Sequence, residues 1–290
     1  MATVTPDLGR AGGSGGEGSN VLRLGKPFRY TVLILVGAFF IIPILASARF
    51  SFLGNNNSYT LSAYTQLFGT PQFWSTLWLS VKVGVGTVAL TLVLLIPTVI
   101  FVHVRLPRLR RLFESVSLLP LVIPSVVVTL GVITSFRNLP NIIYGTPVIL
   151  ALEYVVLALP YSYRTFDSAV QSIDLKTLVD AGQSLGAGWI KLLRFAILPN
   201  LRSGLLGASI LTFAFCLGEF AVASLLSFTT FPVFLVQVGR LEASQAVALS
   251  LIALIFTWIP LALVMIVFSQ RRGARRVAGV ESAIEAAVAD

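Results

Sequence analysis

The chain has 290 residues, of which 56% are hydrophobic and only 11% are charged, and its formal net charge is +9. A soluble domain carries about 25% charged residues because its surface faces water, so this composition excludes an ordinary globular protein and indicates a lipid environment. The single cysteine, Cys216, cannot form an internal disulfide, and no Cys/His cluster indicates a metal site.

The N-terminal segment, residues 1–27, is polar and rich in glycine. It cannot bury enough apolar surface to order itself, so we expect a disordered cytoplasmic tail. It lacks the short apolar core and small-residue cleavage site of a signal peptide. We therefore interpret the first hydrophobic segment as a membrane span.

Six stretches are long and apolar enough to cross a bilayer as helices, since a span needs about 20 such residues. They predict spans at 30–50, 77–102, 113–136, 148–163, 204–228 and 246–268. The fourth is the shortest. Prolines at 43, 97, 120, 124 and 260 fall in or near these stretches and predict kinks. The sequence thus predicts an all-α membrane domain over residues 28–270.

The basic residues orient these spans, because cytoplasmic loops carry an excess of Lys and Arg. Four basic groups fall on one side if both termini are cytoplasmic, and the opposite side holds little beyond Arg49, Arg137 and Arg240. The last basic group opens a cytoplasmic C-terminal tail, residues 271–290. The positive charge therefore follows from topology, and nucleic acid is not needed to explain it. His103, at a basic helix end, is interpreted as an interfacial residue.

One cytoplasmic loop, residues 164–203, is long and has the pattern of ordered structure. Asp174 is placed to cap a helix that begins at Leu175. The predicted apolar face of this helix is Leu178, Ala181 and Leu185, and a second short helix with Ile190, Leu193 and Ile197 is expected to end at Pro199. Gly186 lies between the two, where a residue without a side chain permits a sharp turn.

This loop carries a spaced set of residues that resembles the EAA loop of binding-protein-dependent ABC importer permeases. The family pattern is Glu-Ala-Ala, three residues, Gly, nine residues, Ile, one residue and Leu-Pro. The matching positions here are Asp180, Ala181, Gly182, Gly186, Ala196, Leu198 and Pro199. Asp replaces Glu, Gly replaces the second Ala, and Ala replaces Ile. The loop also lies between the fourth and fifth of six spans, as in the type I permease fold.

The resemblance implies a fold, a location and partners. The fold would be a six-helix, MetI-like type I permease with a cytoplasmic coupling helix, in the bacterial cytoplasmic (inner) membrane. The loop, over 174–199, would bind a separate ABC ATPase, with Asp180, Ala181, Gly182, Gly186, Leu198 and Pro199 as the coupling residues. A second permease, expected to be a different chain, and an extracytoplasmic substrate-binding protein would complete the transporter.

The sequence contains no G-x-x-x-x-G-K-[ST] motif for nucleotide phosphates and no nucleophile–base arrangement. We therefore expect a non-catalytic subunit without a cofactor of its own, with ATP and Mg bound by the partner ATPase. Charged residues within spans are costly and are candidates for the substrate pathway. They are Glu219, Glu153 and Lys82, although Lys82 is also placed to extend towards the lipid headgroups.

The cargo is left open by the sequence. Leu185-Gly186-Ala187, Ala158-Leu159-Pro160-Tyr161 and Leu217-Gly218-Glu219-Phe220 are similar to segments of polyamine, ferric-iron, phosphonate and sulfate permeases. Two acidic residues in spans favour a cation such as spermidine or putrescine, and iron, phosphonate, sulfate or sugar remain alternatives. A stand-alone secondary carrier and a membrane scaffold are the competing classes, but neither explains the spaced loop residues.

Overall fold

A computed structural model describes residues 26–53, 58–136, 143, 145–259 and 262 of the chain. The predicted tails at 1–27 and 271–290 therefore lie almost wholly outside the described residues. The described part is helical and contains no β-strand beyond one isolated bridge between Leu53 and Tyr59. The all-α prediction is confirmed.

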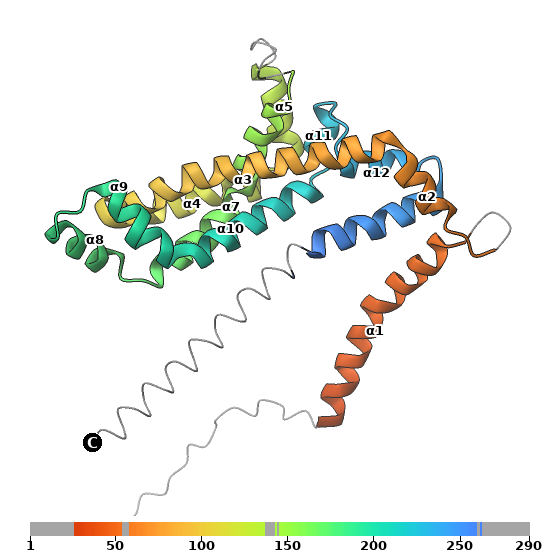
Figure 1. The fold of residues 1–290 in the computed structure, drawn as a ribbon, viewed down its shortest axis with the longest axis horizontal. Coiled ribbons are helices and arrows are strands. Elements are labelled where there is room, and N and C mark those ends of the chain that lie inside the picture. The colour runs from red at the N-terminus through yellow and green to blue at the C-terminus, as the bar shows by residue number, and fades with distance from the viewer. Residues whose placement is uncertain (1–25, 54–57, 137–142, 144, 260–261, 263–290) are drawn as a thin grey trace, which may run out of the picture. The chain divides into compact units, whose positions relative to one another are not determined.

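The N-terminal half contains α1 (Lys26–Ser51), α2 (Ser62–Gly69), α3 (Pro71–Arg105), the short η1 (Pro107–Leu109), α4 (Arg110–Val122) and α5 (Ser125–Phe136). The C-terminal half contains α7 (Val148–Gln171), α8 (Leu175–Ser184), α9 (Trp189–Leu192), η2 (Leu193–Ile197), α10 (Leu198–Gly218), α11 (Ala221–Leu225), α12 (Phe231–Gly239) and a last helix, Ala243–Ile259. Figure 1 shows α8 and α9 at one end of α3, α7 and α10, and α2 and α12 at the other.

Three helical stretches in the described part are long and apolar enough to cross a membrane: Tyr30–Ser51, Pro71–Arg105 and Trp189–Gly218. A fourth is obtained if α4 and α5, bent by 94° relative to each other, count as one span. The predicted fourth span corresponds to the helix α7, which continues eight residues beyond its expected end at Tyr163 and is not among these apolar stretches. The last helix reaches Ile259, and the remainder of the predicted sixth span lies outside the described residues.

The structure corrects two predicted spans. The third is broken because Ile123, which precedes Pro124, has an extended backbone (φ −95°, ψ 121°), the conformation that a following proline favours. The fifth ends at Gly218, since Glu219 is also extended, and a short α11 follows. Hydropathy did not reveal either break, because apolar residues continue on both sides of each.

The segment 1–47 forms a unit of its own, and residues 48–290 form the other compact unit. Nearly all described side chains of α1 are exposed, including Leu33, Ile34 and Phe39. Such an apolar surface is suited to lipid or to another membrane helix. The core lies in the second unit, in three apolar clusters.

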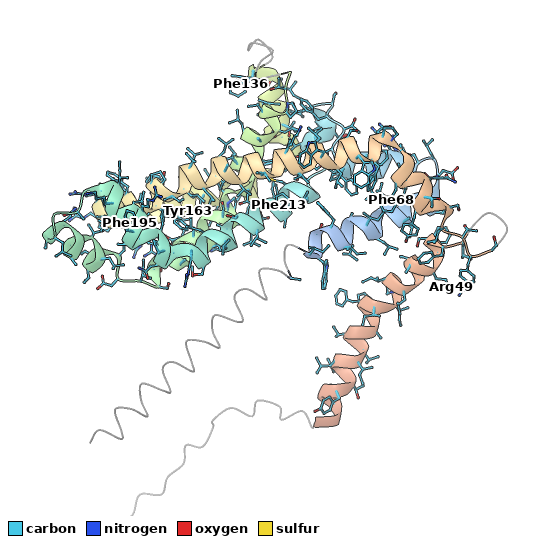
Figure 2. The ribbon with its side chains drawn as sticks, viewed as in Figure 1. Arg49, Phe68, Phe136, Tyr163, Phe195 and Phe213 are labelled. Carbon is cyan, nitrogen blue, oxygen red and sulfur yellow. The ribbon has the colours of Figure 1, made fainter. Side chains whose placement is uncertain are left out.

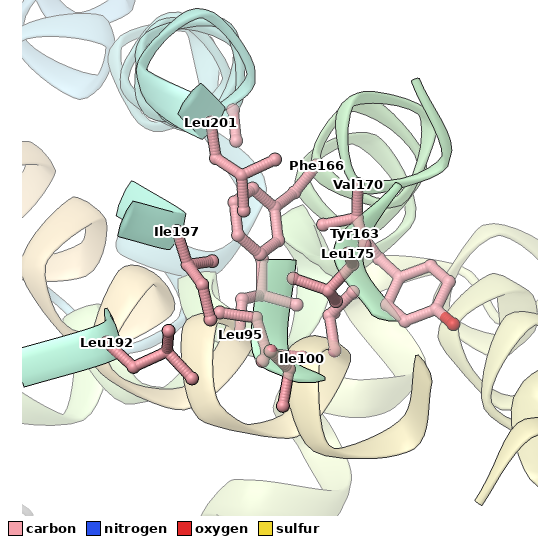
Figure 3. Packing of buried hydrophobic residues seen from close by; sticks show 12 residues of the cluster. Leu95, Ile100, Tyr163, Phe166, Val170, Leu175, Leu192, Ile197 and Leu201 are labelled. Atoms are coloured by element: carbon pink, nitrogen blue, oxygen red, sulfur yellow. The ribbon is translucent and has the colours of Figure 1, made fainter. Parts of the chain in front are cut away.

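The largest of these clusters, here called the main cluster, joins α3, α7, α8, α9, η2 and α10 (Figure 3). Its buried members are Leu95, Val99, Ile100, Tyr163, Phe166, Val170, Leu175, Val179, Leu192, Ile197, Leu201 and Ala208. Small residues allow α7 and α10 to approach closely, because a Cβ on Gly204 would collide with the Cβ of Ala169. Packing through small residues is the usual way membrane helices associate.

Candidate coupling site and membrane pathway

The segment formed by α8 and α9 begins where the sequence predicted. Asp174 caps α8: its Oδ1 accepts the Thr177 backbone N–H at 3.2 Å, and its Oδ2 accepts the Thr177 hydroxyl at 2.7 Å. The hydroxyl and then the backbone hydrogen bond lower the pKa of the Asp174 carboxyl below its ordinary value. The carboxylate therefore stays charged at the positive end of the α8 dipole.

Gly186 ends α8 in a Schellman motif. The Gly186 N–H donates to the Gln183 carbonyl and the Ala187 N–H donates to the Gly182 carbonyl, both at 2.9 Å. The φ of Gly186 is +74°, a left-handed conformation that a side chain disfavours. The glycine at this motif position is thus required by the turn itself.

Gly182 occupies the second Ala position of the EAA pattern, and the structure supplies a reason for the departure. A Cβ at Gly182 would collide with Cδ1 of Leu192, which is buried in the main cluster. Because glycine lacks the methyl group that the family's alanine carries, residue 182 of α8 leaves room for Leu192 of α9. The two short helices are packed against each other as one body.

The faces of these helices differ from those predicted. Leu175 and Val179 are the buried residues of α8, whereas Leu185 is 87% exposed. Asp180 and Ala181 are exposed as well. The predicted apolar face thus points partly outward, since the inward face follows Leu175, Val179 and Gly182, one residue out of phase with Leu178, Ala181 and Leu185.

The predicted apolar set of the second short helix is divided between two faces. Ile190 is 79% exposed, whereas Ile197 is buried together with Leu192, which was not in the set. Phe195 of η2, labelled in Figure 2, is 74% exposed. The segment therefore has a buried apolar face on the main cluster and exposed apolar side chains at Leu185 and Ile190.

Pro199 does not end this helix, and that prediction was wrong. The chain continues from α9 through the five-residue π-helical segment η2 into α10, with Pro199 in the first turn of α10. A proline is tolerated in a first turn, where its missing N–H is not needed. Leu198 is half-buried and Pro199 is exposed at this junction.

A buried polar cluster near this segment was missed by the sequence analysis. Asp167 on α7 is 6% exposed. Its carboxylate lies 3.3 Å from His103 Nε2 and 3.3 Å from an Arg110 guanidinium nitrogen, and the Gln171 amide also donates to it. His103, expected at an interface, therefore has an acidic partner. The signal available was the spacing, because Tyr163, Phe166, Asp167 and Val170 share the buried face of α7.

The two acidic candidates for the pathway lie near the helix breaks. Glu153 is 4% exposed, and its Oε1 accepts the Thr129 hydroxyl of α5 at 2.5 Å, while Oε2 has no hydrogen-bond partner. Glu219 is half-buried in the break after α10, and its Oε1 accepts the Val222 N–H of α11. The carboxyl groups of Glu153 and Glu219 are close enough to interact electrostatically. Packing with α5 buries Glu153.

Lys82, the third candidate, is not paired with Glu153 or Glu219 in the described residues. It is exposed on α3, and its ammonium lies 5.5 Å from the centroid of the Trp78 ring. The ion pairs found in the described residues do not include Lys82. Within the same residues, no group of three or more His, Cys, Asp or Glu side chains could hold a metal ion.

These features together define a class. Several long apolar helices, one of them broken, are joined by a capped pair of short helices that presents an exposed apolar face, as in a multi-pass membrane permease. The family model of the binding-protein-dependent transport system inner membrane component matches residues 100–276, more than half of the chain. The chain belongs to this family. Membership confirms the predicted type I ABC importer permease class, which is non-catalytic.

Individual relatives agree with this class. The chain is 28% identical over 206 residues to the putative ferric transport system permease protein FbpB 1 of Haemophilus influenzae, covering 67% of this chain and 32% of that protein. It is 25% identical over 205 residues to FbpB of Actinobacillus pleuropneumoniae, covering 67% and 29%. It is 30% identical over 167 residues to the molybdenum transport permease ModB of Mycobacterium tuberculosis, covering 53% and 62%. The chain thus spans about a third of the length of the ferric-transport relatives.

Proposed function

We propose that this chain forms part of the substrate path of an ATP-driven importer and that ABC ATPase subunits bind its α8–α9 segment. One observation carries the proposal. The segment is held from within by Leu175, Val179 and Leu192, yet it exposes Leu185 and Ile190 by 87% and 79%. Large apolar side chains on a rigid, water-facing helix pair are typical of a protein interface.

ATP and Mg belong to the ATPase in this proposal, and this chain contributes no cofactor site. The family motif residues Asp180, Ala181 and Gly186 lie on the exposed side of the segment, which suits a docking role. Leu198 and Pro199 lie where the segment joins α10. A movement imposed on α8–α9 would therefore reach a membrane helix directly.

Other partners follow from the family description and from exposed apolar surface. An extracytoplasmic binding protein delivers cargo, and a second permease, a different chain, completes the path. Exposed apolar side chains on α4 and α5, such as Val122 and Val127, supply surface for that permease or for lipid. The proposed location is the bacterial cytoplasmic membrane with both termini cytoplasmic, the orientation that the basic loops favour. A stand-alone carrier or a scaffold would leave the exposed α8–α9 face unexplained.

For the cargo, ferric iron is the proposal that the relatives and the site jointly favour. Two of the matched relatives are ferric transport permeases, and Glu153 and Glu219 place two carboxyl groups near the helix breaks. Molybdenum, carried by a further relative, is the second candidate, although carboxylates suit it less if it crosses as an anion. The expected polyamine cargo draws no support from the matched relatives.

The docking proposal is tested by site-specific cross-linking in the purified membrane complex. Cys216, the single cysteine of the sequence, is replaced by Ala, and one cysteine is introduced at Ile190 for a photo-activated cross-linker. The matched control is Leu241→Cys, which is also highly exposed but follows α12. We expect the ATPase to be captured from Ile190 and not from Leu241. Equal capture, or none from Ile190, would contradict the proposal.

The cargo proposal is tested by uptake of radiolabelled ferric iron into proteoliposomes that contain the complex and its binding protein. Glu153→Gln replaces the buried carboxyl group, and Glu242→Gln, which is exposed after α12, is the matched control. We expect iron uptake by the parent complex and a lower rate for Glu153→Gln alone. Uptake of molybdate or spermidine in place of iron would assign the cargo otherwise.

A further inference from the structure

The carboxylate of Asp167 joins three helices at one point. It lies on α7, its Oδ2 accepts a hydrogen bond from Arg110 of α4 at 3.3 Å, and its Oδ1 lies 3.3 Å from Nε2 of His103 on α3. Its side chain is 8% exposed, against 34% for Arg110. Charged hydrogen bonds are directional, so this contact fixes the position of α4 along α7.

The broken helix α4–α5 has a second attachment to α7. Thr129 of α5 donates its hydroxyl to the buried Glu153 at 2.5 Å. Glu153 and Asp167 are 14 residues apart on α7, which is about four turns and roughly 21 Å, so both carboxylates lie on one face. The bend at Ile123 and Pro124 falls between the two attachments. Each arm of the broken helix is thus tied to α7 by one carboxylate.

The end of α7 that carries Asp167 is also connected to the α8–α9 segment. Val170 of α7 packs in the main cluster with Leu175 and Val179 of α8. Only Ser172, Ile173 and Asp174 separate α7 from α8. A displacement of α8 therefore displaces the end of α7 that carries Asp167.

Packing also connects α4 to α7, and in the part of the chain that the structure describes the partly buried Phe113 of α4 packs against the main cluster. Apolar contacts are non-directional and permit sliding. In the same residues, the ion pair with Asp167 is the polar contact found between α4 and another helix.

We propose that Asp167 is a positioning residue that transmits movement of the α8–α9 segment to the broken helix α4–α5 through Arg110. This inference rests on the proposed function, because it takes the ATPase as the source of the movement. With the Asp167–Arg110 contact present, α4 moves together with α8. Without the contact, the same movement of α8 produces a smaller movement of α4.

The experiment measures the distance between α4 and α8 by pulsed EPR in the complete transporter complex, purified with its ATPase and placed in nanodiscs. Spin labels are attached at Ser115→Cys on α4 and Lys176→Cys on α8, both exposed, in a Cys216→Ala background. Distances are recorded without nucleotide and after trapping with ATP and vanadate. With Arg110 present, we expect the same narrow distribution in both states. With Arg110→Met, we expect it to shift and broaden after trapping.

Two further variants separate transmission from structural damage. Arg111→Met removes the same charge from the next, exposed position of α4 and should behave as the parent, and Arg110→Lys should restore the narrow distribution. Damage to packing would broaden the Arg110→Met distribution before nucleotide is added, and that result would overturn the proposal. So would an Arg110→Met distribution identical to that of the parent in both states.

A single label at Lys176 separates this inference from the proposed function. If ATP and vanadate change the mobility of that label in the parent but Arg110→Met leaves the α4–α8 distance unaltered, only the role of Asp167 is wrong. If the label at Lys176 does not respond to trapping at all, the coupling role of α8 is wrong, and this inference falls with it.

Discussion

The α8–α9 segment and the breaks after α4 and α10 are all interruptions of regular helix, but their causes differ. The α8–α9 turn is specified locally: Asp174 caps one end and Gly186 has a φ of +74° at the other. The break at Ile123 follows from the adjacent Pro124. The break at Glu219 lies in continuous apolar sequence and has a distant partner, since the Tyr154 hydroxyl donates to the Glu219 carbonyl at 3.4 Å. Local chemistry can be recognised in a sequence, whereas tertiary partners cannot.

The largest expected effect comes from the cluster beneath the α8–α9 segment. Phe166 is fully buried in it, and Phe166→Ala should lower the free energy of unfolding by about 3–5 kcal/mol, through lost burial and the cavity left behind. Phe195→Ala is the matched control, because the same atoms are removed from a side chain that is 74% exposed. It should change that free energy by no more than about 0.5 kcal/mol. Denaturant titration in detergent measures both, and equal losses would show that the cluster does not anchor the segment.

The next largest effect on stability is expected where α7 and α10 approach each other closely. Gly204→Ala places a methyl group against Ala169, which has no flexible side chain to move away, so we expect a loss of about 1–3 kcal/mol. Gly131→Ala on α5 meets no atom within 4 Å and should stay within about 1 kcal/mol of the parent. A Gly204→Ala chain as stable as Gly131→Ala would mean that the two helices are further apart than described.

The turn at Gly186 is expected to show a smaller and purely conformational effect. Gly186→Ala meets no neighbour within 4 Å, so its cost is the left-handed backbone alone, about 1–2 kcal/mol. Gly188→Ala also meets open space, but Gly188 has an ordinary φ of −68° and should tolerate the change. Hydrogen exchange of the amides of Gly186 and Ala187 reports the loss of the motif. Equal exchange in the two variants would refute the local account of this turn.

The smallest effect is the pH dependence of the α8 cap. The folded pKa of Asp174 is lowered by Thr177, so the cap stabilises α8 above the unfolded pKa of aspartate and is lost as the pH falls through the folded value. Amide protection in the first turn of α8, corrected for intrinsic rates, should therefore decrease in acid. Asp174→Asn caps without titrating and should remove that decrease. A decrease that persists in Asp174→Asn would have another source.

The sequence was most informative where residues act on their own neighbours in the chain. It predicted the start of α8 at Leu175, the turn at Gly186 and the permease class, which the family match confirms. Helix phase was harder, because Leu185 and Ile190 are as apolar as the residues buried beside them. An exposed interface and a core can have the same composition, so periodicity alone could not tell which of these apolar side chains are buried.

The polar contacts were the least predictable part of the site. Asp167 gave no signal by itself, since its partners Arg110 and His103 lie 57 and 64 positions earlier in the chain. Pro199 was expected to end a helix, and its actual place follows from the π-helical turn before it. The coupling roles of Asp180, Ala181, Gly182, Gly186, Leu198 and Pro199 stay predictions, as do the pathway roles of Glu153, Glu219 and Lys82.

The most direct test of the central claim is a cryo-EM structure of the complex purified intact from membranes. The account predicts that α8 and α9 are seated in a cleft of the ATPase, with Leu185 and Ile190, now 87% and 79% exposed, buried against it. It also predicts that Leu175, Val179 and Leu192 stay buried in the main cluster. An ATPase bound elsewhere, with Leu185 and Ile190 still facing water, would contradict it.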